Sequence, residues 1–237
     1  MINSLGVTIP MISYPDLIIF DCDGVLVDSE VLASRVVSET LGEYGINISV
    51  QEVSENFAGY TDEAIRDHFC SKADVSLPTK FAQIIEETTI SYIPAELKTL
   101  PFIKETLTNL GYSYCVASNS RNDRLNSALD STGLRDFFPL ERRFSSSMVM
   151  HPKPAPDLHL LACSKMGVSP EQALVIEDTS TGVSAAVAAG ISVFGFVGAE
   201  HIADTKAQSI KLIDAGAITV FDDMRQLNIM LRDYTAA

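Results

Sequence analysis

The chain has 237 residues, of which 46% are hydrophobic, and its formal net charge is −14. This length and composition predict a globular protein with a sizeable core and exclude a disordered chain. The negative charge argues against nucleic-acid and anionic-membrane partners, which need basic surfaces, and no run approaches the ~20 apolar residues of a membrane span.

The first predicted element is a strand. Residues 1–16 are most simply an extension that leads into residues 17–20, four apolar residues typical of a strand buried on both faces. The strand runs directly into Asp21, Cys22 and Asp23. Because residues i and i+2 of an extended chain point the same way, we expect the two carboxylates to face one pocket while Cys22 turns into the protein.

Two carboxylates at the end of a buried strand suit phosphoryl transfer. One can attack phosphorus, the second can carry the proton, and a divalent cation can neutralise the excess charge. The next residue, Gly24, can take the positive φ that turns the backbone away. A strand followed by an ordinary Asp-Gly turn is the plainer interpretation, so the rest of the chain has to decide between them.

Helical patterns follow the first strand. Apolar spacing predicts a helix over residues 31–44, which Gly45 ends, and further helices over residues 54–57, 62–69 and 78–93. A helical block between the first two strands is a domain placed over the site, where it can exclude water and select substrates. The predicted domains are an N-terminal extension (1–16), an α/β core (17–28 and 96–237) and a helical cap (29–95).

From Pro101 the chain alternates between helix and strand. The patterns predict helices over 102–110, 183–189 and 222–231, and strands over 112–117, 173–176, 192–196 and 218–221. This alternation is typical of a parallel sheet with crossover helices. The predicted fold class is therefore α/β, a doubly wound parallel sheet with an inserted helical domain.

Three later segments carry polar groups that fit the same chemistry. Ser118 ends a predicted strand, and its hydroxyl and the backbone N–H of Asn119 can bind a phosphoryl oxygen. Lys153 stands between two prolines, which restrict its backbone. Its side chain supplies a local cation in a negatively charged protein. Glu177 and Asp178 end another strand and offer oxygen ligands to a hard cation. Ligands of open α/β sheets bind at such strand ends.

Together these motifs resemble the haloacid dehalogenase superfamily, most of whose members are Mg²⁺-dependent phosphatases. The match covers residues 20–25, Ser118-Asn119, the Lys-Pro-x-Pro motif at Lys153, and Glu177-Asp178, and residues 28–30 look like the β-phosphoglucomutase-like and sugar-phosphate phosphatase branch. The resemblance implies a doubly wound core with a mobile cap.

The resemblance also implies roles for the matching residues. Asp21 attacks phosphorus and forms an aspartyl phosphate, and Asp23 acts as acid and then as base. Lys153 pairs with the nucleophile and the transferring phosphoryl group. The phosphoryl oxygens are held by Ser118, Asn119 and Lys153, and Mg²⁺ by Asp21, the backbone carbonyl of Asp23, and Asp178, with Glu177 in support.

The helical block distinguishes a phosphatase from a mutase. Thr61 lies in the loop that contacts substrate in the relatives, although it is equally well placed as a helix N-cap. Mutases of the branch carry an arginine for a second phosphate where this chain has Asp62, and a hinge histidine where it has Ala33. Both departures count against a mutase, which is kept as the alternative to the predicted phosphatase.

Other classes fit the residues less well. Asp23 disfavours a dehalogenase, which needs no leaving-group acid, and a phosphonatase has alanine at that place. A non-catalytic sensor of phosphorylated ligands on the same fold is the alternative from another class. The predicted substrate is a small phosphorylated metabolite, such as a sugar phosphate or a sugar-acid phosphate, and we expect a monomer or weak homodimer.

The remaining reactive side chains point to no second site. The cysteines, at positions 22, 70, 115 and 163, form no CxxC pair and are typical of free thiols in a reducing compartment, so we expect a cytoplasmic protein. The four histidines show no metal spacing. Of these, His151 and His159 are expected to be surface or helix residues.

Overall fold

The computed structural model describes residues 15–57, 61–72, 76–202 and 204–236, so residues 1–14 of the predicted extension lie outside the described residues. The strands are β1 (Leu17–Phe20), β2 (Ser113–Ser118), β3 (Arg143–Ser145), β4 (Ala173–Glu177), β5 (Ser192–Phe196) and β6 (Thr219–Phe221). The helices are α1 (Glu30–Glu43), α2 (Val50–Phe57), α3 (Asp62–Lys72), α4 (Phe81–Glu96), α5 (Ile103–Thr108), α6 (Asn122–Ser131), α7 (Asp157–Met166), α8 (Ser180–Ala188), α9 (Thr205–Ala215) and α10 (Leu227–Ala236). Within the described part, no helix combines the length and the apolar character that crossing a membrane requires.

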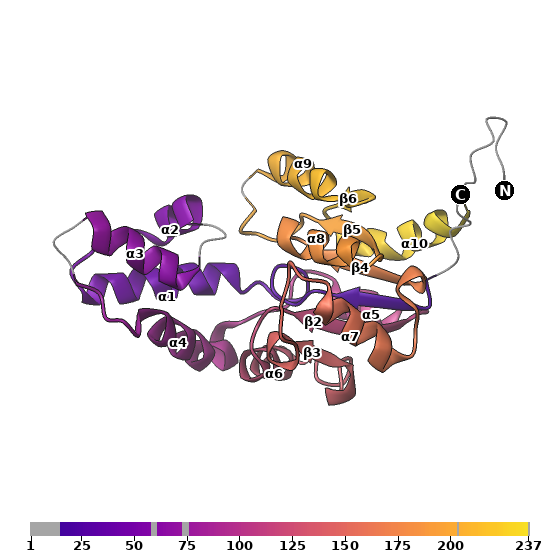
Figure 1. Cartoon of the computed structure of the whole chain (residues 1–237), viewed down its shortest axis with the longest axis horizontal. Coiled ribbons are helices and arrows are strands. Elements are labelled where there is room, and N and C mark those ends of the chain that lie inside the picture. Colours follow the sequence, from indigo (N-terminus) through magenta and orange to yellow (C-terminus); the bar gives the residue numbers. More distant parts are fainter. Residues whose placement is uncertain (1–14, 58–60, 73–75, 203, 237) are drawn as a thin grey trace.

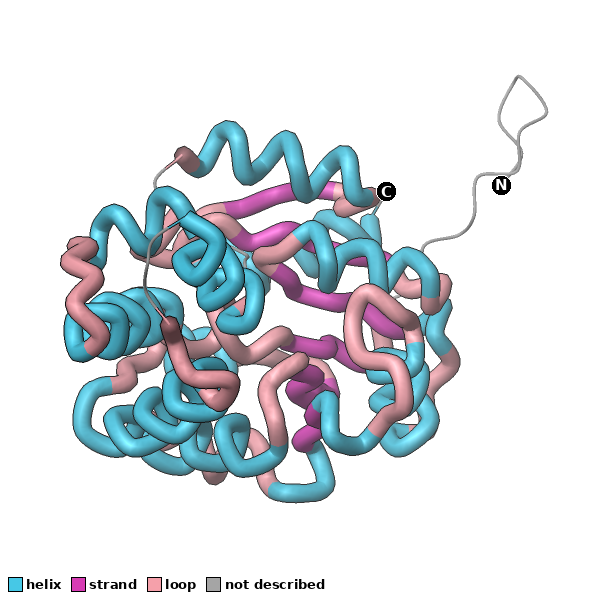
Figure 2. The backbone as a smooth tube through the Cα atoms, turned by 60° about the vertical axis from the view of Figure 1, so that its left-hand side comes forward, coloured by secondary structure: helices cyan, strands magenta, loops and turns pink. Residues whose placement is uncertain are grey.

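The strands form one parallel sheet in the order β3-β2-β1-β4-β5-β6. The chain therefore starts at the centre, builds outward through β2 and β3, and returns to build the other half through β4, β5 and β6. Figure 2 shows these strands as a layer between helices. The predicted doubly wound α/β fold is confirmed.

Both faces of the sheet are buried because successive residues of β1 point to opposite sides. Ile18 and Phe20 belong to an apolar cluster with residues of α5, α6 and α10, whereas Leu17 and Ile19 belong to a second cluster with residues of α7, α8 and α9. All four β1 side chains are at most 1% exposed. This two-sided burial explains why a parallel strand is a continuous apolar run.

Helices α1 to α4 form a separate group, called here the helical block, at the end of the sheet toward which β1 points (Figure 1). Helix α1 packs on α2 and α4 and buries an apolar stripe that includes Leu32, Val36 and Leu41. Two neighbouring segments connect the block to the sheet. They are joined by a backbone hydrogen bond from Leu100 to Leu26, with an N–O distance of 3.0 Å.

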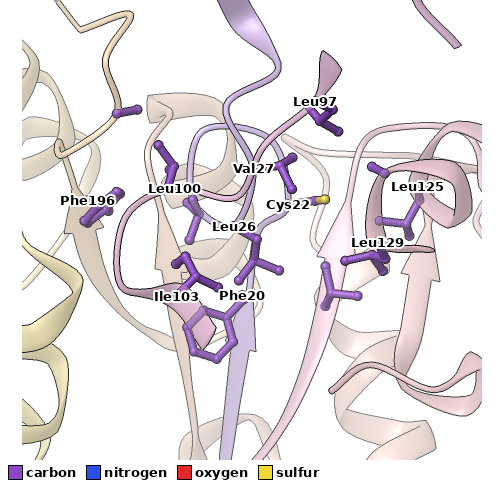
Figure 3. Close-up of a cluster of buried hydrophobic side chains, with 14 of the residues drawn as sticks. Phe20, Cys22, Leu26, Val27, Leu97, Leu100, Ile103, Leu125, Leu129 and Phe196 are labelled. Atoms are coloured by element: carbon purple, nitrogen blue, oxygen red, sulfur yellow. The ribbon is translucent and has the colours of Figure 1, made fainter. Parts of the chain in front are cut away.

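The apolar core continues from the sheet into these connections. Figure 3 shows Phe20 at the end of β1 near Leu26, Leu100 and Ile103, with Cys22 and Val27 close by. These side chains are at most 2% exposed. The packing fixes where both connections leave the sheet, and so holds the helical block over the strand ends.

Candidate active site

A cavity of about 490 Å³ lies at the carboxyl ends of β1, β2 and β4. Phe20, the last residue of β1, is paired with both Val116 and Ile176, so β2 and β4 end within two residues of the level of Phe20. The cavity is lined by all the site residues predicted from the sequence, namely Asp21, Asp23, Thr61, Ser118, Asn119, Lys153, Glu177 and Asp178. The helical block contributes further lining residues, among them Glu30 and Glu86.

Lys153 lies between two carboxylates on the floor of this cavity. Its Nζ is 2.6 Å from Asp21 Oδ1 and 2.8 Å from Glu177 Oε2, and all three side chains are buried. Burial and the charge of Glu177 raise the pKa of Asp21, although Lys153 opposes this. Burial alone would lower the pKa of Lys153, but the two carboxylates raise it, so the ammonium stays charged.

The side chain of Asn119 holds the loop that carries Lys153. Its Oδ1 accepts a hydrogen bond from the backbone N–H of Lys153 at 2.9 Å, and its Nδ2 donates to the backbone carbonyl of Lys153 at 3.0 Å. This amide is therefore committed to positioning Lys153. Its backbone N–H, which the sequence analysis assigns to phosphoryl binding, is not part of this clamp.

Three buried carboxylates meet beside Lys153. Oxygen atoms of Asp21, Glu177 and Asp178 lie within 4.8 Å of one another. Burial, with the charges of Glu177 and Asp21, raises the pKa of Asp178, and its Oδ1 has no hydrogen-bond partner among the described residues. In contrast, Glu177 also accepts a hydrogen bond from the hydroxyl of Thr179 at 2.7 Å. The cluster therefore carries excess negative charge and a buried oxygen that a hard cation suits.

A glycine allows this close packing. Gly24 has a φ of +78°, and a Cβ there would lie 2.0 Å from Asp178 Oδ2. Any side chain would therefore be both strained and in collision with the carboxylate. The sequence analysis assigns Gly24 the turn, but the contact with Asp178, far along the chain, is visible only in the structure.

Asp23 is held by three hydroxyl groups from two segments of the chain. Ser29 donates to Oδ1 at 2.5 Å, while Ser120 and Ser118 donate to Oδ2 at 2.7 and 3.3 Å. Burial would raise the pKa of Asp23, but Arg124 and these hydroxyls lower it below its usual value. The carboxylate is thus an ionised acceptor in this structure. Ser29 belongs to the motif at residues 28–30, and Ser120 directly follows the Ser118-Asn119 motif, but neither contact with Asp23 was predicted from the sequence.

Arg124 connects Asp23 to the helical block. It lies on α6, and its Nη2 is 3.7 Å from Asp23 Oδ1 while its Nη1 donates to Glu86 Oε2 on α4 at 3.0 Å. Both ion-pair partners are largely buried, with side-chain exposures of 18% for Arg124 and 23% for Glu86. Sequence reasoning missed this link. An arginine in the first turn after the Ser-Asn tip is its only local signal.

At the helical block, Thr61 and Asp62 mark the start of α3. The Thr61 hydroxyl accepts a hydrogen bond from the backbone N–H of Ala64 at 3.2 Å, and Thr61 also lines the cavity, so the structure is compatible with both predicted roles. Burial raises the pKa of Asp62 to about 6; Arg124 opposes the rise, and nearby carboxylates add to it. Gly59 and Tyr60 of the predicted substrate loop lie outside the described residues.

Two histidines have surroundings that the sequence does not indicate. His159 lies on α7, in line with the prediction of a surface or helix residue, but it is 0% exposed, and burial lowers its pKa well below the usual range. His201, which the sequence analysis passed over, has ring nitrogens 3.9 Å from both Asp28 Oδ1 and Asp178 Oδ2. His201 therefore borders the acidic cluster.

Comparison with known proteins identifies the family to which the chain belongs. Residues 18–196 match the model of the haloacid dehalogenase-like hydrolase family. The chain belongs to this family, as its motifs predict.

Its relatives identify the enzyme class. The chain is 28% identical to 6-phosphogluconate phosphatase of Escherichia coli (strain K12) over 78% of this chain and 84% of that one. It is 31% identical to fructose-1-phosphate phosphatase YqaB of the same organism over 73% and 92% of the two chains. A solved haloacid dehalogenase-like protein of unknown function from Agrobacterium tumefaciens str. C58 superposes with a TM-score of 0.82 and 37% identity, covering 92% and 98%. The protein is a phosphoric monoester hydrolase of this family, in its sugar-phosphate branch.

Proposed function

We propose that the protein hydrolyses a phosphate monoester of a small metabolite, a sugar phosphate or sugar-acid phosphate, through an aspartyl-phosphate intermediate and with Mg²⁺. The observation that carries the proposal is the placement of Asp21 against Lys153, with Asp23 two residues away in the same cavity. This arrangement supplies a nucleophile, a cation for the phosphoryl group and a proton carrier.

In the first step, Asp21 attacks phosphorus in line with the ester oxygen. Lys153 contacts Oδ1, which leaves Oδ2 to form the new O–P bond as the P–O bond to the leaving alcohol breaks. Asp23 gives the leaving oxygen its proton, for which it has to bind a proton first, because its surroundings in this structure favour the ionised form. Ser118, the backbone N–H of Asn119 and Lys153 bind the phosphoryl oxygens as charge develops.

In the second step, water attacks the aspartyl phosphate. Asp23, now ionised, takes a proton from the water, which adds to phosphorus while the bond to Asp21 breaks. The products are inorganic phosphate and free Asp21. The hydroxyls of Ser29 and Ser120, which donate to Asp23, orient the carboxylate for this transfer and favour its ionised form.

The residues present fit Mg²⁺. Asp21, Asp178 and the backbone carbonyl of Asp23 would hold it, while Glu177, which accepts hydrogen bonds from Lys153 and Thr179, would support the site. The raised pKa of Asp178 and its unpartnered buried Oδ1 are what a missing hard cation predicts. When bound, Mg²⁺ neutralises charge on the carboxylates and phosphoryl oxygens.

We further propose that residues 29–95 act as a cap over a core of residues 17–28 and 96–237. The helical block lies at the carboxyl end of β1 and lines the cavity with Thr61, Glu30 and Glu86. Two connections join it to the sheet, as a cap that opens and closes requires. The cytoplasmic location and the monomeric or weakly dimeric state stay predictions.

The test is phosphate release from a panel of phosphorylated metabolites, with Mg²⁺ and with EDTA. We expect Mg²⁺-dependent release from at least one sugar or sugar-acid phosphate. A panel without release, or release unaffected by EDTA, would contradict the proposal. The mutase alternative is tested with a glucose 1-phosphate and a sugar bisphosphate primer. Because Asp62 repels a second phosphate, we expect phosphate release to outrun isomer exchange.

A further inference from the structure

Carboxylates of the helical block line one side of the catalytic cavity. Glu30 on α1 and Glu86 on α4 both contribute to it. Glu86 also lines a neighbouring cavity of about 550 Å³, together with Asp62, Glu63 and Glu87 of the same block. A metabolite whose phosphate lies at Lys153 and Asp21 therefore extends toward a surface rich in carboxylates.

The cations that line these two cavities are already paired. Lys153 contacts Asp21 and Glu177. Arg124 contacts Glu86 at 3.0 Å and lies 3.7 Å from Asp23. Arg121, whose side chain is 69% exposed, lies 3.5 Å from Asp123. Among the described residues that line the cavities, every lysine and arginine has a carboxylate beside it.

This charge pattern discriminates between substrates by their second functional group. A carboxylate or second phosphate beside Glu86 would face like charge in a partly desolvated site, where repulsion is stronger than in water. Hydroxyl groups can donate hydrogen bonds to the same carboxylates, and an ammonium group can form an ion pair with them. The pKa values of Asp62 and Glu30 are raised first by burial and in part by neighbouring carboxylates, although Arg124 opposes the rise at both residues and His201 opposes it at Glu30.

We propose that the substrate is a phosphate monoester whose alcohol portion carries hydroxyl or ammonium groups and no second anion, with Glu86 and Glu30 as specificity-determining residues. The inference rests on the proposed phosphatase function. It narrows the predicted substrates to sugar or polyol phosphates and their amino derivatives, and excludes sugar-acid phosphates.

The test uses three open-chain compounds that differ only at C1. They are glucitol 6-phosphate, with a hydroxymethyl group, 6-phosphogluconate, with a carboxylate, and 1-amino-1-deoxyglucitol 6-phosphate, with an ammonium group. For the full chain with Mg²⁺, we expect kcat/KM for 6-phosphogluconate to be at least about tenfold below that for glucitol 6-phosphate. The amino compound should equal or exceed glucitol 6-phosphate.

Two variants locate the discrimination. Glu86→Gln removes a cavity carboxylate and releases Arg124, so it should raise the ratio of kcat/KM for 6-phosphogluconate to that for glucitol 6-phosphate by roughly tenfold. Glu43→Gln makes the same charge change at an exposed position at the end of α1 and should leave the ratio unchanged. Equal shifts in both variants would overturn the assignment to Glu86.

The outcomes separate this inference from the function on which it rests. p-Nitrophenyl phosphate, which lacks a second anion, serves as the common probe of phosphatase chemistry. If it is hydrolysed but 6-phosphogluconate matches or exceeds glucitol 6-phosphate, the substrate inference is wrong and the phosphatase proposal stands. If none of the four compounds releases phosphate with Mg²⁺, both are overturned.

Discussion

Both the strand ends and the helical block carry carboxylates at the cavities, but the groups that surround these carboxylates differ between the two regions. At the strand ends, Asp21 has Lys153 at 2.6 Å, and Asp23 has three hydroxyl donors and Arg124. In the helical block, Asp62 lines the neighbouring cavity, and burial raises its pKa to about 6, with nearby carboxylates adding to the rise and Arg124 opposing it. Asp21 and Asp23 at the strand ends thus each have a cation or hydroxyl donors beside them, whereas the pKa of Asp62 in the block is set first by burial.

The two regions also differ in how they are fixed. The core carboxylates follow strands whose register is set by neighbouring strands on both sides, so their relative positions are rigid. The block reaches the cavity through helices and two connections, and the contact between Arg124 and Glu86 links it to the core. Substitutions in the core should therefore affect chemistry most, and those in the block should have smaller effects.

The largest expected effect follows replacement of the nucleophile. Asp21→Asn removes the attacking oxygen's charge while keeping the shape, so kcat should fall by roughly 10⁴-fold or more. Steady-state phosphate release measures this, and circular dichroism checks that the fold is unchanged. Activity near that of the unaltered protein would contradict covalent catalysis by Asp21.

The second effect concerns the buried cation. Lys153→Met leaves Asp21 and Glu177 without their partner, which should lower the free energy of unfolding by about 3–5 kcal/mol in EDTA. Mg²⁺ should restore part of this loss because it supplies a cation to the same carboxylates. Urea unfolding with and without Mg²⁺ measures both quantities.

A control variant tests whether the loss of stability is specific to Lys153. Lys165→Met removes an exposed lysine from the last turn of α7 and should cost less than about 1 kcal/mol, without dependence on Mg²⁺. A loss for Lys153→Met as small as that for the control would show that the carboxylates do not depend on Lys153.

The sequence predicts the core well where burial alone decides the pattern. Strands β1 and β5 have their predicted bounds because two-sided burial makes each a short apolar run. Strand β3 was missed because it has three residues and includes Arg143, which is buried through contacts with Asn126, Asp130 and the carbonyl of Phe138. Helix α9 was missed because it buries only Leu212 among its residues and so has no clear apolar stripe.

The site, too, is predictable from the sequence where local patterns decide the position of a residue. Residues at strand ends are predictable because parallel strands end together, and the structure brings all of them to one cavity. Their chemical roles stay predictions. The pairing of Arg124 with Glu86 joins positions 38 residues apart through the packing of α6 on α4, and no local pattern encodes such a contact.

The third prediction tests that pairing. Arg124→Met leaves Glu86 and Asp23 without their shared cation, so the free energy of unfolding should fall by about 2 kcal/mol. Glu86→Gln should cost less because it keeps a polar partner. The double variant should show a coupling energy on the order of 1 kcal/mol, measured by urea unfolding of all four proteins. Strictly additive losses would show that the contact between core and block contributes no energy.

The smallest effect is expected for Asp62→Asn, which should stabilise the folded protein. The pKa of Asp62 in the folded protein, about 6, lies above the ordinary value of 3.8. The folded state therefore binds this proton more tightly than the unfolded state, and the stability that it contributes is present below about pH 4 and lost as the pH rises through about 6. Asp62→Asn removes the ionisation. After discounting for solvent screening, the variant should be more stable than the unaltered protein by about 1 kcal/mol near pH 8 and equal to it below about pH 4.

The matched control, Asp67→Asn, changes an aspartate on the same helix, whose side chain is 67% exposed, and should show no comparable gain. Urea unfolding at both pH values decides the matter, because an equal stability of Asp62→Asn and the unaltered protein near pH 8 would mean that the charge of Asp62 is compensated, and the contrast between the strand ends and the helical block would not hold at this residue.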